Sequence, residues 1–274
     1  MSASLTANSA RLGAIARRDW RTVKRYQFRQ LLRLLDFVYA AILAFYVGRL
    51  FDTVPDELTE YGGNYFDFAM VGLAVMSVAG LGIGTFNDTI TREQTLGTLE
   101  VLLVTPTPVP VLLAGSLVLP LALTFIDIAL YVGVGIGVFG VGLSWSGVLL
   151  SIPLFLLTLA SFCAFGIVGA SIAVLAKRGD PLSGPLIQAT AVLSGALFPV
   201  SVFPPVLELL ARCFPAYYGI NGLREALLGG GSWSDIAPDV AVLAGFVVVL
   251  LPLSVWIFER ALAASRRAGI LGNY

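Results

Sequence analysis

The sequence predicts an all-α polytopic membrane protein with six transmembrane helices. Hydrophobic residues make up 57% of its 274 residues and charged residues 12%, with a mean hydropathy of +0.88. A soluble domain carries about 25% charged residues. Several apolar runs reach roughly 20 residues, which is enough to cross a bilayer as helix. A β-barrel would instead show short segments of alternating hydrophobicity.

The first element expected is an amphipathic helix, over residues 9–30 of an N-terminal region that covers residues 1–35. Its apolar face carries Leu12, Ala16, Trp20, Val23 and Tyr26, and six basic residues fall opposite. This pattern favours a cytoplasmic helix lying in the membrane interface. A helix packed on a soluble partner is the alternative.

The spans follow from the apolar runs and lie within a membrane domain over residues 36–258. We expect them at residues 36–51, 65–86, 108–140, 147–176, 182–203 and 236–258, before a cytoplasmic tail over residues 259–274. The third is longer than one crossing needs, which predicts a tilt or a kink around its glycines. Gly80 and Gly84 form a GxxxG pattern that predicts a helix contact.

Lysine and arginine counts predict that both termini are cytoplasmic. With that orientation 14 of the 17 basic residues lie on the cytoplasmic side. Arg49, Arg212 and Arg224 remain for the outer side or the membrane. Cytoplasmic loops are enriched in Lys and Arg, so the bias supports this topology.

A charged, helix-favouring segment joins the second and third spans at about residues 88–105. It carries Arg92, Glu93 and Glu100 among leucines, and Pro106 and Pro108 stop it before the third span. We interpret it as an interfacial helix whose charges meet a soluble partner. A solvated interfacial loop is the alternative.

A second irregular segment covers about residues 204–232. Pro204, Pro205 and Pro215 divide it into two helical pieces, at about 206–213 and 216–228, that are too short to cross the membrane. Two short helices that re-enter from the outer face fit this pattern, provided that protein or water covers the irregular backbone. An outer loop with one surface helix is the alternative.

The sequence lacks the common motifs for catalysis, nucleotide binding and metal binding. It has no histidine, no GxxxxGK[ST] phosphate loop, no HExxH and no GxSxG. Gly135, Gly137 and Gly140 spell GxGxxG, but they lie inside an apolar run, where glycine serves helix packing. We therefore expect no catalytic residue, bound cofactor or metal on this chain. The net charge of zero gives no attraction to nucleic acid.

Asp127 is the polar candidate within the third span. An intramembrane carboxylate is a functional candidate by default. The alternative is a neutral side chain, or one that is hydrogen-bonded to a neighbouring helix.

Two motifs resemble the membrane subunit of ABC transporters of the ABC-2 (type V exporter) class. The first is REQTLGTLEVLLVTPTP, Arg92 to Pro108, in which Gln94 stands where many members carry a basic residue. The second is SGALFPVSVFPPVLELLARCFPAYYGINGLREALLGG, Ser194 to Gly230. With the basic N-terminal helix and six spans, the resemblance covers nearly the whole chain.

The resemblance implies a plasma-membrane export permease driven by a separate ATPase subunit, which would hold ATP and Mg. The connector would be a coupling helix, with contacts to the ATPase at Arg92, Glu93, Gly97, Thr98 and Glu100. The outer gate region would contain Phe198, Pro199, Pro204, Pro215 and Arg224. A second permease copy would complete the pathway as a homodimer, or a related permease would do so as a heterodimer.

Two other functions compete with export. The first is an ATP-driven membrane subunit that handles lipids or assembles a complex without a continuous pore. The second is an intramembrane enzyme, which Asp127 alone supports weakly. The spans at 36–51 and 182–203 show almost no polar stripe, which favours an apolar or amphiphilic cargo, or a pathway that stays shut at rest.

Overall fold

Eight α-helices and one short 3-10 helix make up the described part of the chain. The computed structural model describes residues 27–50, 65–96, 109–139, 145–176 and 183–267. The α-helices are α2 (Gln27–Leu50), α4 (Tyr65–Thr95), α6 (Val109–Phe139), α7 (Trp145–Ala176), α8 (Ser183–Leu193), α9 (Pro205–Arg212), α10 (Pro215–Leu227) and α11 (Trp233–Arg267), with η1 at Val200–Val202. Regular structure in these ranges is entirely helical, which confirms the predicted class.

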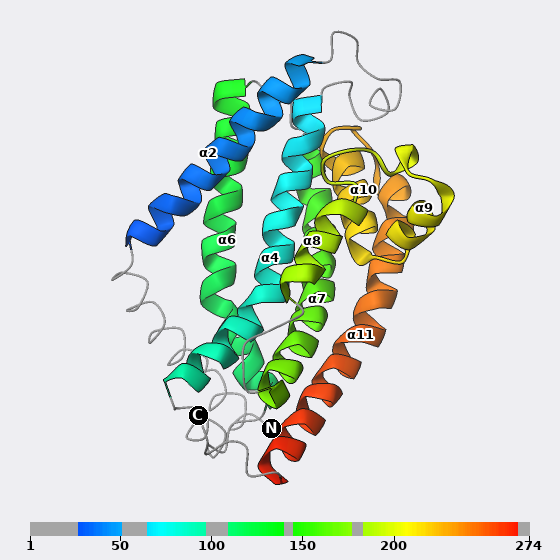
Figure 1. Ribbon diagram of the computed structural model, residues 1–274. Helices are drawn as coiled ribbons and strands as arrows, with labels where there is room; N and C mark the ends of the chain where they lie inside the picture. Colours follow the sequence, from blue (N-terminus) through cyan, green and yellow to red (C-terminus); the bar gives the residue numbers. More distant parts are fainter. Residues whose placement is uncertain (1–26, 51–64, 97–108, 140–144, 177–182, 268–274) are drawn as a thin grey trace, which may run out of the picture.

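The centre of the bundle is the contact between α4 and α7, and α11 packs along α7 (Figure 1). The backbones of α4 and α7 approach closely where Gly82 meets Gly166. A Cβ atom at Gly166 would collide with the Gly82 carbonyl oxygen, and one at Gly82 would collide with Phe162. Small residues allow such an approach between membrane helices. Phe86, Phe162 and Phe258 are fully buried in the main hydrophobic core.

The described residues do not show the predicted contact at Gly80 and Gly84: among them, a Cβ atom at either position would meet no atom within 4 Å. Gly82 lies on another face of the same helix, and that face is the one turned toward α7. The GxxxG pattern therefore lies on α4, but the close contact of α4 with α7 is made by Gly82 on another face of that helix.

Two helices lie at the edge of the bundle. α2 crosses the molecule obliquely in Figure 1 and packs on α4 through Ala41, Ala44 and Phe66. α6 lies on the same side and also contacts α4. Its Phe125 ring meets the Phe155 ring of α7 at a centroid distance of 5.3 Å.

Three of the helices are long and apolar enough to cross a membrane: Tyr65–Thr95, Ser146–Ala176 and Trp233–Ser265. α2 and α6 carry shorter apolar stretches, Val38–Arg49 and Leu113–Ile126. The chain is thus a polytopic helical membrane protein, while the count of six spans stays a prediction.

Several predicted boundaries differ from the structure. α4 continues without a break through the first residues of the connector to Thr95, and α11 continues through Arg267 into the predicted tail. α2 already includes Gln27, so the boundary expected at residue 35 falls inside a helix. α8 ends at Leu193, ten residues before the predicted end of the fifth span. The residues of the N-terminal helix before residue 27 lie outside the described ranges.

Candidate functional site

The two segments singled out by the sequence lie at opposite ends of α4. The helix has 31 residues and is therefore about 46 Å long. Its first turns, near Phe68, contact α10, whereas its last turns lie at the lower end of the bundle in Figure 1. One continuous helix thus connects the first residues of the connector to the broken segment at residues 194–232, which we call the outer element.

At the lower end of α4, the charged residues of the connector lie on two faces of the helix, one exposed and one buried. Arg92 is exposed, whereas Glu93 is 4% exposed and Gln94 is also buried. The Gln94 amide Nε2 donates a hydrogen bond of 3.1 Å to the Ala173 carbonyl oxygen near the end of α7. Glu93 and Gln94 therefore belong to the interior of the bundle, and Arg92 is the residue of the three that a partner can reach.

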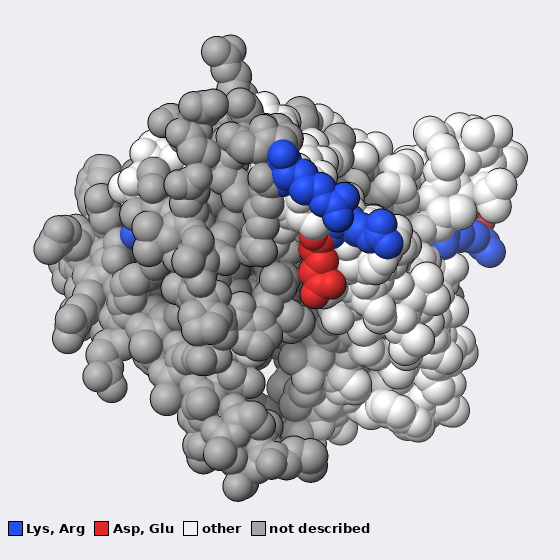
Figure 2. Space-filling view, turned by 90° about the horizontal axis from the view of Figure 1, so that it is seen from below, with Lys and Arg blue, Asp and Glu red and all other residues white. Residues whose placement is uncertain are grey.

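Seen from below, the described surface at this end is largely uncharged (Figure 2). Basic side chains lie there beside an acidic one near the middle of the face. Gly97, Thr98 and Glu100, the other predicted contacts, lie outside the described residues.

At the upper end, Arg224 joins three elements of the fold. It lies in α10 and is 4% exposed. Its guanidinium donates to the Phe68 carbonyl oxygen of α4 at 3.1 and 3.3 Å, and to the Ala196 carbonyl oxygen at 3.0 Å. The same group lies 3.3 Å from the centroid of the Phe68 ring. Hydrogen bonds from a charged donor are stronger than neutral ones, so Arg224 fixes the outer element to α4.

Glycines and prolines shape the outer element locally. Gly195, with φ +74°, lies two residues after the end of α8, in a conformation that other residues rarely adopt. Pro204 precedes α9, and Pro205 and Pro215 begin α9 and α10, where a missing N–H costs nothing. The two predicted short helices are therefore confirmed, while their re-entry into a membrane stays a prediction.

The predicted gate residues divide into two groups. Pro215 and Arg224 are buried in α10. Phe198, Pro199 and Pro204 lie on the irregular stretch between α8 and α9, where Phe198 and Pro204 are exposed and Pro199 is half-buried. Arg224 connects the groups because it binds Ala196, two residues before Phe198.

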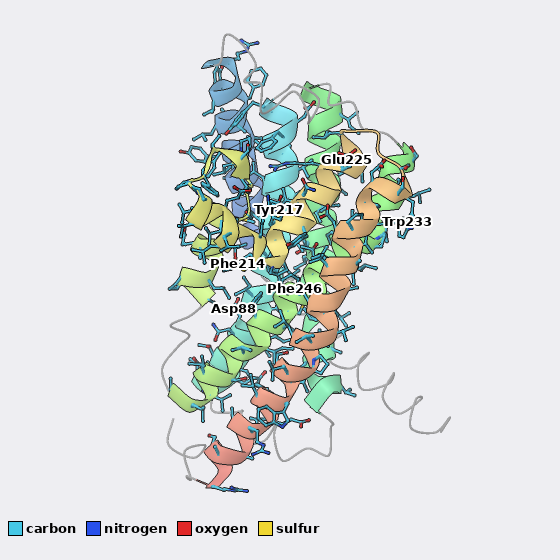
Figure 3. The ribbon with its side chains drawn as sticks, turned by 90° about the vertical axis from the view of Figure 1, so that its right-hand side faces the viewer. Asp88, Phe214, Tyr217, Glu225, Trp233 and Phe246 are labelled. Atoms are coloured by element: carbon cyan, nitrogen blue, oxygen red, sulfur yellow. The ribbon has the colours of Figure 1, made fainter. Side chains whose placement is uncertain are left out.

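A hydrogen bond and a ring contact join α10 to α11, and an ion pair lies within α9. The Asn221 amide donates to Asp239 of α11 at 2.9 Å, and the Tyr218 and Phe246 rings are 6.2 Å apart. Figure 3 shows Phe214 and Tyr217 beside α9, and Glu225 nearer the upper end. On the exposed face of α9, Arg212 pairs with Glu208 at 2.6 Å, and this hydrogen bond raises the pKa of Arg212.

Asp127 lies in α6, but its side chain is outside the described part of the structure. Among the described side chains no group of three or more His, Cys, Asp and Glu residues gathers to hold a metal ion. Cys163 is buried and Cys213 is exposed.

The sequence reasoning overlooked Asp67. This carboxylate lies in the first turn of α4, and one of its oxygens is buried without a hydrogen-bond partner in the described structure. A charged residue inside a predicted span was the available signal. Its place at the end of the span made it resemble an ordinary interfacial charge.

The long apolar helices define a helical membrane protein. Residues 11–228 match the ABC-2 type transporter family. Because that match covers most of the chain, the protein belongs to this family of membrane transporter components and is not itself an enzyme.

Two curated relatives are similar over part of the chain. Nodulation protein J of Sinorhizobium fredii (strain NBRC 101917 / NGR234) is 30% identical over 122 residues, covering 43% of this chain and 45% of the relative. Nodulation protein J of Rhizobium leguminosarum bv. trifolii is 29% identical over 118 residues, with the same coverage of both chains. The chain thus spans about half the length of the curated relatives it matches.

Proposed function

We propose that this chain is the membrane permease subunit of an ABC exporter, driven by a separate ATPase subunit that binds the connector at residues 88–105. ATP and Mg would be held by that ATPase. The proposal places the connector and both termini in the cytoplasm, in agreement with the distribution of basic residues.

The continuity of α4 is the observation that carries the proposal. A displacement of the connector would be passed along one helix, which is fixed to α7 by the Gln94–Ala173 hydrogen bond and close contact at Gly82. At its other end the helix is bound to the outer element through Arg224. A displacement of the lower end of α4 would therefore also move α7 and the outer element.

A second permease copy completes the proposed assembly. Large apolar side chains remain exposed on α2 and α11, among them Tyr39, Tyr46, Val248 and Trp256. Lipid and a second copy of this chain would share these surfaces. A homodimer is the simplest form, because one chain supplies half of a two-subunit pathway, and a related permease could take the place of the second copy.

A charge reversal at Arg92 tests the docking. The tagged protein is purified from its own membranes in mild detergent, and associated proteins are identified by mass spectrometry. We expect a stoichiometric ATPase subunit whose recovery falls at least ~10-fold in Arg92→Glu, because a reversed interfacial charge costs on the order of several kcal/mol.

Arg267→Glu is the matched control, since Arg267 is an exposed arginine at the end of α11. The control should retain the ATPase. Equal recovery with both variants, or no ATPase with the unaltered protein, would contradict the proposal. It would then favour the alternative, a membrane subunit for lipid handling or complex assembly without a continuous pore.

A further inference from the structure

A cavity of about 280 Å³ lies between α4, α6, α7 and α10. Its α4 wall consists of Asp67, Met70, Val71, Ala74, Val75 and Val78. The spacing of these residues puts them on one face of the helix. From Asp67 to Val78 this wall runs about 16 Å along the helix axis. The cavity is therefore elongated, with its carboxylate at the upper end of α4.

Among the described residues, the other walls are apolar apart from one serine. α6 and α7 contribute Phe125 and Phe155, whose rings touch, and α10 contributes Leu223 and Leu227. Ser151 is the other polar residue of the lining, but its hydroxyl donates to the carbonyl oxygen of Val148 at 2.7 Å in its own helix. The Ser151 oxygen can still accept a hydrogen bond, but Asp67 is the charged group among the described residues of the lining and therefore the stronger acceptor for a cationic ligand.

The Asp67 side chain is half-buried, and its Oδ1 atom is buried with no hydrogen-bond partner among the described residues. A buried polar atom without a partner is costly, and a carboxylate can only accept hydrogen bonds. The terminal torsion of Asp is broad and roughly two-fold, so rotation about it can exchange the two oxygens. A donor supplied by a ligand would remove the cost.

We propose that this cavity binds a single-chain amphiphile with a protonated amine as its head group. The ammonium group binds Asp67, and the hydrocarbon tail lies along α4 between the rings of α6 and α7. A cavity of 150 Å³ in another protein accommodates benzene, and a methylene group is about as large as a water molecule, ~30 Å³. The volume of this cavity therefore matches a tail of roughly nine or ten carbons.

Photolabelling in phosphatidylcholine nanodiscs tests this proposal. The probe is decylamine with a diazirine near the end of its chain, and its sites of attachment are mapped by mass spectrometry. Competitors are decylamine, decanol and decanoate, which share the tail and differ in head group. We expect labels on the cavity walls, and competition by decylamine at least ~10-fold stronger than by decanoate, equal to about 1.4 kcal/mol.

Three variants separate the head-group site from the tail site. Asp67→Asn should remove the preference for the amine and leave the labelled positions unchanged. Asp88→Asn, at an exposed position of the same helix outside the cavity, should keep the preference. Ala74→Phe should fill the cavity and abolish labelling of its walls.

Equal competition by the three head groups would overturn the proposal and indicate a site for the tail of any bilayer lipid. Labels outside the cavity, or a preference that survives Asp67→Asn, would also overturn it. If Asp67→Asn does not fold, the head-group comparison on the unaltered protein and Ala74→Phe still decide. The test needs no ATPase, so its failure leaves the permease proposal standing.

Discussion

The two ends of α4 are held in different ways. At the upper end a buried arginine binds two backbone carbonyls and stacks on a ring, so the helix, α10 and the stretch near Ala196 form one unit. At the lower end a hydrogen bond from the neutral Gln94 amide joins the helix to α7, and Arg92 lies exposed beside it. The upper end is thus held by a buried charge, whereas the charge of Arg92 at the lower end is exposed.

This contrast predicts that substitutions at the upper end of α4 lower the free energy of unfolding more than substitutions at the lower end. The free energy of unfolding can be measured for each variant by titration with a denaturing detergent in mixed micelles.

The largest effect is expected at the upper end. Arg224→Ala leaves two buried carbonyl oxygens with fewer donors and removes the stacking on Phe68, so we expect a loss of about 3–5 kcal/mol. Arg212→Ala, which breaks only an exposed pair within α9, should leave unfolding unchanged. A loss below about 1 kcal/mol in Arg224→Ala would remove the distinction between the ends.

The middle of α4 should show the next largest effect. Gly82→Leu forces a side chain into Phe162 and separates α4 from α7, which should cost about 1–3 kcal/mol. Gly84→Leu, two residues along the same helix, points into open space and serves as the control. Comparable losses in both variants would mean that this contact does not set the position of α4.

The smallest effect is expected at the lower end. Gln94→Leu keeps the volume but loses the hydrogen bond to Ala173, so we expect a loss of about 1 kcal/mol. Thr95→Val is the comparison, because the exposed Thr95 hydroxyl bonds only within its own helix in the described structure, and it should show no loss. A loss in Gln94→Leu as large as that in Arg224→Ala would show that both ends are fixed alike.

The sequence predicted the helical class and the break points of the outer element because apolar run length, glycine and proline act locally. α9 and α10 begin at Pro205 and Pro215, within one residue of their expected starts. The ABC-2 assignment is confirmed by the family match. These features need no knowledge of which helices are neighbours.

The faces of the helices could not be predicted in the same way. The closest contact of α4 falls at Gly82 rather than at the GxxxG pair, and Glu93 turns inward although it belongs to a charged segment. Both depend on which elements pack against α4. The cavity beside Asp67 likewise arises from the positions of four helices, which no single segment specifies.

The central claim is that the lower end of α4 binds an ATPase subunit, and site-directed cross-linking tests it most directly. The chain has two cysteines, so Cys163→Ala and Cys213→Ser give a background without thiols. A cysteine at the exposed Thr95 should form a cross-link to the co-expressed ATPase, whereas one at Arg267 should not. No cross-link from position 95, or equal cross-linking from both positions, would contradict the account.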